Sequence, residues 1–320
     1  MDLAENVVLG GLTFGSLTSE EEVTAIMNRA WDLGIRRIDL GPTYGEGLAR
    51  QLVARHLKSH PTQPWMIWEK LGLWVNLAGR GVTHLQLGYG NRQSLDEARN
   101  TSRSLFGDLG IDCYLLHVPP EPNEWEPLLE TLQLIWADLE IGSVGLSNHE
   151  ASEMTTSNSI LGRAGFQVSN SQVHYNFAER RAESEFLPTA RSLAVASVAN
   201  RIFARGLLTR SSPKASARFK ASQKLRRRAV GLGGHYRYMI ARATRALGRP
   251  APEIFLAWTL RPGGCDRVVL GISNQTQLDA VANLIREPIE VTALEEISAL
   301  SSADMNLAMA QPRTLFDIGY

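Results

Sequence analysis

The chain has 320 residues, and its 33 Lys and Arg residues balance its 33 Asp and Glu residues. This neutral balance argues against a nucleic-acid-binding protein, and no apolar run approaches the roughly 20 residues that a membrane helix needs. Two cysteines, Cys113 and Cys265, are too few for a disulfide framework, and the first residues lack the pattern of a signal peptide. We therefore expect a cytoplasmic protein without nucleic-acid or membrane partners.

Short apolar segments alternate with longer helical patterns from one end of the chain to the other. In chain order, the predicted strand and helix pairs are 7–12 with 19–33, 35–40 with 48–57, 65–71 with 94–109, 111–117 with 125–139, 143–147 with a helix from about 150, 166–175 with 184–193, 194–199 with the long segment 202–260, and 267–272 with 276–285. Ser19 and Glu22 form a capping-box pattern, and so do Ser94 and Glu97. A glycine-rich loop is expected after residue 71.

Eight strand-then-helix units predict an α/β protein with a parallel sheet and helical crossovers. Several strands are almost continuously apolar, as expected where helices cover the sheet. An open sheet rarely needs eight such units, so we expect a closed (β/α)8 TIM barrel that forms a single domain over residues 1–320.

Two regions depart from this alternation. Residues 209–233 form a polar and basic segment, which is either a solvated loop or a flap that folds over an anionic cofactor. Residues 290–320 form a C-terminal tail with one further helical pattern and an irregular end.

Four residues with chemically active side chains lie at or just after the ends of predicted strands: Asp39, Tyr44, Lys70 and His117. In a parallel barrel the C-terminal strand ends meet on one face, where the chemistry of such barrels takes place. An acid, a phenol, an amine and an imidazole at that face suit the movement of a proton onto a carbonyl oxygen or away from it.

Carbonyl reduction assigns a role to each of these side chains. Tyr44 would donate the proton, Lys70 would favour the phenolate that remains, and Asp39 would hold Lys70 in place. His117 would orient the substrate oxygen or act as the donor itself. Each residue alone also has a structural interpretation, because a strand-end His, a turn-capping Asp and a packing Tyr are common.

The spacing Asp39-x4-Tyr44-Gly45, followed by Lys70 and His117, resembles the aldo-keto reductase superfamily. The resemblance extends from about residue 7 to residue 284 and includes GLSN (145–148), QVHYN (172–176), RGLLT (205–209) and LGISNQTQL (270–278). It implies an NADP-dependent oxidoreductase, with NADPH as the expected cofactor and NADH as the alternative. It also implies a small carbonyl compound as substrate and no metal ion.

The resemblance further implies a cofactor site at the mouth of the barrel. By position, Ser147, Asn148 and Gln172 would hold the nicotinamide carboxamide, Gly206 and Leu207 would line the pyrophosphate, and Gly271, Ser273 and Gln277 would contact the adenosine phosphate end. Asn200 stands where the family has a stacking aromatic residue. The segment 271–280 has no Lys or Arg, so the candidates for binding a 2′-phosphate are Arg205, Arg210 and Lys214.

The substrate pocket is expected to include Leu12, Trp74 and Trp125. Gly11, counted with the cofactor site, and Leu12 stand where the family commonly has a polar and a bulky residue, which would open the pocket slightly. His56 and His60 have metal-ligand spacing, but we expect a solvated helix end there.

Two other functions stay open at this stage. One is a pathway-specific reductase of a sugar or natural-product carbonyl intermediate. The other is a non-catalytic dinucleotide-binding regulatory subunit. The sequence makes no prediction of the oligomeric state.

Overall fold

Eight parallel strands close into a barrel in the computed structural model, which describes residues 3–77, 82–139, 141–209 and 236–302. The strands are β1 (Val7–Gly10), β2 (Arg37–Leu40), β3 (Met66–Leu71), β6 (Cys113–Leu116), β7 (Ser143–Ser147), β8 (Val168–His174), β9 (Ala196–Asn200) and β10 (Arg267–Gly271). Their order around the barrel is β1-β10-β9-β8-β7-β6-β3-β2. The predicted (β/α)8 fold is thereby confirmed.

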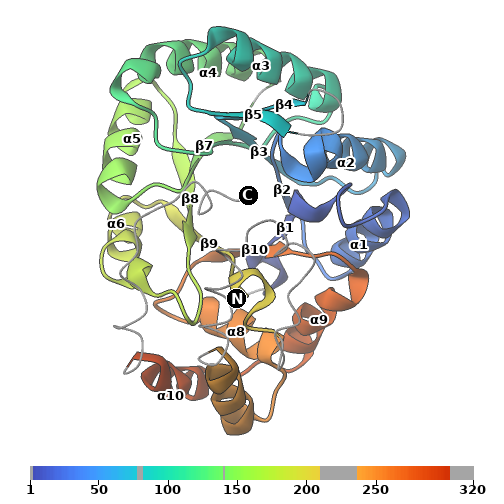
Figure 1. Cartoon of the computed structure of the whole chain (residues 1–320), viewed down its shortest axis with the longest axis vertical. Coiled ribbons are helices and arrows are strands. Elements are labelled where there is room, and N and C mark those ends of the chain that lie inside the picture. Colours follow the sequence, from blue (N-terminus) through green and yellow to red (C-terminus); the bar gives the residue numbers. More distant parts are fainter. Residues whose placement is uncertain (1–2, 78–81, 140, 210–235, 303–320) are drawn as a thin grey trace.

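Helices form a ring around the strands (Figure 1). They are α1 (Glu20–Asp32), α2 (Leu48–Ser59), α3 (Arg92–Phe106), α4 (Trp125–Leu139), α5 (Ala151–Arg163), α6 (Phe186–Ser192), α8 (Ala251–Thr259), α9 (Asp279–Arg286) and α10 (Val291–Ser302), and residues 236–247 are also helical. The capping box predicted at Ser19 and Glu22 is present at the start of α1. Helix α10 is fixed to α8 by the Trp258 indole N–H, which donates to the Ser298 hydroxyl at 2.6 Å.

The hydrophobic core has two parts. The larger part fills the space between the strands and the surrounding helices. The smaller part lies among the strands and includes Val8, Trp68, Cys113, Leu115 and Val198. Because these side chains pack together from separate strands, they support the polar residues at the strand ends. Trp68 is 4% exposed and is the largest side chain of this smaller part.

The connection after β3 differs from the prediction. Instead of a glycine-rich loop, two strands, β4 (Leu73–Leu77) and β5 (Val82–Leu87), pair in antiparallel fashion. Apolar residues recur two positions apart at Leu73, Val75 and Leu77 in β4 and at Leu85 and Leu87 in β5, which fits the period of a strand. Helix α3 begins at Arg92 rather than Ser94, because the Asn91 side chain caps it by accepting from the Ser94 N–H at 3.1 Å.

Two predicted regions fall partly outside the described residues. The basic loop predicted over 209–233 does so from residue 210 onwards, and the tail predicted over 290–320 does so from residue 303 onwards. Within the ranges that the structure describes, no helix combines the length and the apolar character required to span a membrane.

Candidate active site

Three neighbouring barrel strands bring the predicted catalytic residues together. Asp39 lies in β2 and Lys70 in β3, and these two strands pair in parallel. His117 directly follows β6, which pairs with β3 on its other side. Tyr44 begins the one-turn helix η3 (Tyr44–Gly47) after β2. All four residues therefore lie toward the C-terminal ends of their strands, as the sequence predicts.

The Asp39 carboxylate is the centre of this group. Its side chain is 1% exposed and forms a buried ion pair with the Lys70 ammonium, which contacts both carboxylate oxygens. The Tyr44 hydroxyl donates to Asp39 Oδ1 at 3.3 Å. The Gln172 amide donates to Asp39 Oδ2 at 2.5 Å from the other side of the barrel. Asp39 thus holds an amine, a phenol and an amide in one place.

Backbone geometry at Gly45 fixes the position of Tyr44. Gly45 has a φ of +56°, and a Cβ atom there would lie 1.7 Å from the Phe14 carbonyl oxygen. Only glycine fits this contact, so the turn that carries Tyr44 is packed against the loop after β1. The Lys70 ammonium nitrogen lies 5.2 Å from the centre of the Tyr44 ring. A positive charge is therefore close enough to stabilise a phenolate.

His117 is buried and neutral in this environment. Burial lowers the pKa of the His117 imidazole well below its usual value, and the charge of Lys70 lowers it further. Among the described residues, no partner reaches its buried Nδ1 atom. The His117 backbone is held on both sides, since its N–H donates to the Leu71 carbonyl and its carbonyl accepts from the Asn148 amide, each at 2.8 Å. A neutral, fixed imidazole suits hydrogen bonding to a substrate oxygen.

Tyr89 supports the site, although no sequence motif marks it. Its side chain is fully buried. Its hydroxyl donates to the Val118 carbonyl at 2.9 Å and lies 3.3 Å from the Leu71 carbonyl oxygen. It therefore connects the ends of β3 and β6, next to His117.

The residues predicted to bind the nicotinamide lie at the ends of adjacent strands. Ser147 in β7 is the register partner of Gln172 in β8, and Asn200 ends β9. Asn148 adopts a left-handed backbone with a φ of 59°, and its amide donates to the Ser147 hydroxyl at 3.2 Å. The buried Asn200 Oδ1 atom has no partner in the described part of the chain. Hydroxyl and amide groups of this kind suit a neutral carboxamide, whose N–H groups need an acceptor.

The residues predicted to contact the phosphates follow β9 and β10. Gly206 has a φ of +89° and ends the turn η6 (Ala204–Gly206), and Leu207 follows it. Gly271 is exposed, and a side chain there would meet open space. The Ser273 N–H already donates to Gln277 Oε1 at 2.8 Å. The side chain of Arg205 lies outside what the structure describes.

The structure describes the side chains of two of the three residues predicted to line the substrate pocket. Leu12 lies half-buried in the turn η2 (Gly11–Thr13), and Trp125, also half-buried, begins α4 and packs against the large core. Trp74 lies in β4, but its side chain is not described. Gly11 lies in the same turn as Leu12, and a Cβ atom there would lie 2.7 Å from the Leu40 side chain, so whether Gly11 opens the pocket stays a prediction.

The solvated helix end that we expected at His56 and His60 is wrong for His56. His56 is 4% exposed and stacks on His60, with ring centres 4.1 Å apart. Burial lowers the pKa of His56 to about 4, and the neighbouring His60 adds to this effect. Among the residues with described positions, no three His, Cys, Asp or Glu side chains gather as metal ligands would.

Comparison with known proteins gives consistent results. Residues 6–302 match the model of the aldo/keto reductase family. A Schizosaccharomyces pombe protein provisionally named an aryl-alcohol dehydrogenase is 24% identical over 86% of each chain. D-threo-aldose 1-dehydrogenase of a Pseudomonas species is 25% identical over 81% of this chain and 82% of its own. The NADH-specific methylglyoxal reductase of Escherichia coli is 25% identical over 55% of each chain.

Proposed function

This chain belongs to the aldo/keto reductase family, and from that premise we propose that it reduces an aldehyde or ketone to an alcohol with a nicotinamide dinucleotide as cofactor. The observation that carries the proposal is the convergence of the Tyr44 hydroxyl and the Lys70 ammonium on the buried Asp39 carboxylate. A phenol beside a fixed positive charge can deliver a proton and stabilise the phenolate that remains.

The proton-transfer step uses side chains of this chain alone. Tyr44 donates its hydroxyl proton to the carbonyl oxygen. Lys70, 5.2 Å from the Tyr44 ring centre, stabilises the resulting phenolate. Asp39 keeps Lys70 oriented through their buried ion pair. When bound, the nicotinamide supplies the hydride that the carbonyl carbon requires.

His117 orients the substrate rather than acting as the acid. Its lowered pKa leaves the imidazole neutral near pH 7, so it offers a hydrogen bond and not a readily transferred proton. This distinction favours Tyr44 as the donor. The two roles that the sequence left open for His117 are thus reduced to one in this proposal.

The dinucleotide fits the polar groups of the chain at the mouth of the barrel. The buried and unpartnered Asn200 Oδ1 atom can accept from a carboxamide N–H, and the Ser147 hydroxyl lies two strands away. Gln172 donates to Asp39 and is also a candidate for the nicotinamide, so the cofactor site and the proton-donor site share a side chain. This shared residue supports hydride and proton delivery to one substrate position.

NADPH is the cofactor that we propose, with NADH as the alternative. The segment 271–280 has no Lys or Arg to pair with a 2′-phosphate. One relative, the Escherichia coli methylglyoxal reductase, is named as NADH-specific. We therefore expect a preference for NADPH of less than about tenfold, since a charge-assisted phosphate contact is absent from this loop.

The proposed substrate is a small carbonyl compound in the cytoplasm. Names of relatives refer to aryl alcohols, an aldose and methylglyoxal, so the first panel should include aromatic aldehydes, aldoses and dicarbonyl compounds. The aldose relative also keeps the sugar pathway reductase as a second candidate. Both cysteines are free thiols, in agreement with a reducing compartment.

Two assays test the proposal together. Tryptophan fluorescence titration with NADPH and NADH in parallel measures cofactor binding, and steady-state absorbance at the nicotinamide band measures turnover across the panel. We expect binding of both dinucleotides and turnover of at least one substrate class. Tight binding without turnover of any carbonyl compound would reject the proposal in favour of a regulatory subunit.

A further inference from the structure

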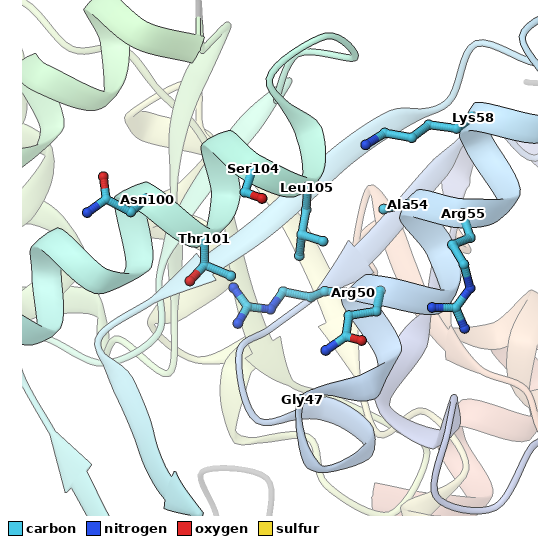
Figure 2. Close-up of a pocket in the computed structure, with 10 residues that line it drawn as sticks. Gly47, Arg50, Ala54, Arg55, Lys58, Asn100, Thr101, Ser104 and Leu105 are labelled. Atoms are coloured by element: carbon cyan, nitrogen blue, oxygen red, sulfur yellow. The ribbon is translucent and has the colours of Figure 1, made fainter.

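A hollow of about 480 Å³ lies between α2 and α3, outside the barrel (Figure 2). Helix α2 contributes Gly47, Arg50, Gln51, Ala54, Arg55 and Lys58 to its lining, counting the residue that precedes the helix, and α3 contributes Asn100, Thr101, Ser104 and Leu105. None of the residues predicted to carry out catalysis or hold the cofactor lines it. It is therefore a separate feature of the molecule.

The positions of the cationic side chains in the hollow follow from the spacing of residues along α2. Arg50, Ala54 and Lys58 recur every four residues and so share one face of the helix. The short Ala54 leaves space between two long cationic side chains, whose Cα atoms are about 12 Å apart from the helical rise alone. On α3, Thr101 and Ser104 are small and polar. The hollow is thus lined by two cationic side chains that start about two helical turns apart.

Both of these cations extend from α2 toward α3, as Figure 2 shows. Lys58 is exposed, and among the side chains that the structure describes no carboxylate lies within ion-pair distance of its ammonium. Arg55 is different, because its guanidinium is already paired with Glu20 at 2.9 Å on the neighbouring helix α1. Lys58 is thus the cation at its end of the hollow that is available to a ligand.

Arg50 has a partner that neutralises it only in part. Its guanidinium contacts Glu69 at 3.1 Å, but its buried Nε atom and the buried Glu69 Oε2 atom have no partners among the described residues. The Glu69 side chain is completely buried, and burial raises the pKa of its carboxyl to about 7 despite the opposing charge of Arg50. Near neutral pH, a fraction of the molecules thus have a protonated Glu69 and an uncompensated Arg50 charge.

We propose that the hollow between α2 and α3 binds a small polar molecule with an anionic group at each end, such as a sugar bisphosphate, through Arg50 and Lys58. Guanidinium and ammonium groups are the usual partners of phosphate oxygens. Ser104 on α3 is exposed and also lines the hollow, so its hydroxyl can bind the polar body of such a ligand. The proposal does not depend on the activity proposed for the barrel mouth.

Calorimetric titration of the full chain with fructose 1,6-bisphosphate tests this site. Excess NADPH is kept in the cell and the syringe, so that phosphate groups of the probe do not compete for a dinucleotide site. Glucose 6-phosphate and glucose are titrated under the same conditions. We expect the bisphosphate to bind more tightly than the monophosphate and glucose not to bind. Absence of bisphosphate binding, or equal affinity for all three probes, would overturn the proposal.

Two substitutions and one control variant assign the binding to this hollow. Lys58→Ala should weaken bisphosphate binding by roughly five- to tenfold, because one charge-assisted contact is lost. Arg163→Ala, which removes an exposed cation from α5, is the matched control and should leave the affinity unchanged. Glu69→Gln should tighten binding at pH 8, since the carboxylate that competes for Arg50 is then removed. Unchanged affinity in Lys58→Ala, or an equal loss in Arg163→Ala, would refute the assignment.

Discussion

Replacing Glu69 by Gln measures how much the buried carboxyl group of this β3 residue lowers the free energy of unfolding when it is ionised. Glu69 directly precedes Lys70, and its side chain points to the helices, where it pairs with Arg50. Burial raises the pKa of this carboxyl from its ordinary value of 4.5 to about 7. Between these two pH values the folded chain keeps a proton that the unfolded chain has released, so the free energy of unfolding falls as pH rises.

The size of the effect follows from the two pKa values. Each pKa unit corresponds to about 1.4 kcal/mol, so the wild type should lose about 3 kcal/mol of stability relative to Glu69→Gln between pH 4.5 and pH 7.5. Gln keeps the size of the side chain but does not titrate in this range. Other titrating groups contribute equally to both proteins and cancel in the difference.

Urea unfolding of both proteins at several pH values measures this difference. Glu295→Gln, at an exposed position in α10, is the control and should follow the wild type at every pH. A stability difference between wild type and Glu69→Gln that stays constant across the range would refute the reasoning. It would mean that the Glu69 carboxyl has the same pKa in the folded chain as in the unfolded chain.

Three further substitutions test the active-site geometry. Gly45→Ala should lower the free energy of unfolding by about 1–3 kcal/mol or more and also lower turnover, because its Cβ would meet a backbone oxygen. The control is Gly162→Ala in α5, which has open space around it and should raise the free energy of unfolding by about 0.5–1 kcal/mol. Asp39→Asn leaves Lys70 buried without a counter-charge, which should cost about 3–5 kcal/mol in urea unfolding. His117→Gln should lower kcat/KM about tenfold or more without changing the pH profile between pH 6 and 8, since His117 is neutral there; the loss of a limb from that profile would contradict this.

The alternation of strands and helices predicted the barrel, because the period of each element depends only on residues close together in the sequence. Since the C-terminal ends of parallel strands meet on one face of a barrel, the same alternation also predicted the convergence of Asp39, Tyr44, Lys70 and His117. The hairpin β4–β5 was not predicted because the neighbouring glycines were interpreted as a loop. Leu73, Val75 and Leu77 nevertheless recur with the period of a strand. Local sequence patterns are thus sufficient to predict single strands and helices and their order along the chain.

Contacts between distant segments could not be predicted in the same way. Arg50 and Glu69 form a buried pair from a helix and a strand, and neither residue stands out in its own segment. Gln172 reaches Asp39 across 133 positions of sequence. The requirement for glycine at Gly45 depends on the carbonyl of Phe14, which only the folded loop brings close. These contacts arise from the closure of the barrel and the packing of helices on it.

The central claim is that Tyr44 supplies the proton to the substrate carbonyl. Single-turnover reduction by pre-formed dinucleotide complexes of wild type and Tyr44→Phe measures this step directly, and fluorescence titration of both proteins checks that the cofactor still binds. The account predicts unchanged cofactor affinity and a turnover rate lower by about 10²–10⁴-fold in Tyr44→Phe. Equal single-turnover rates in the two proteins would contradict it.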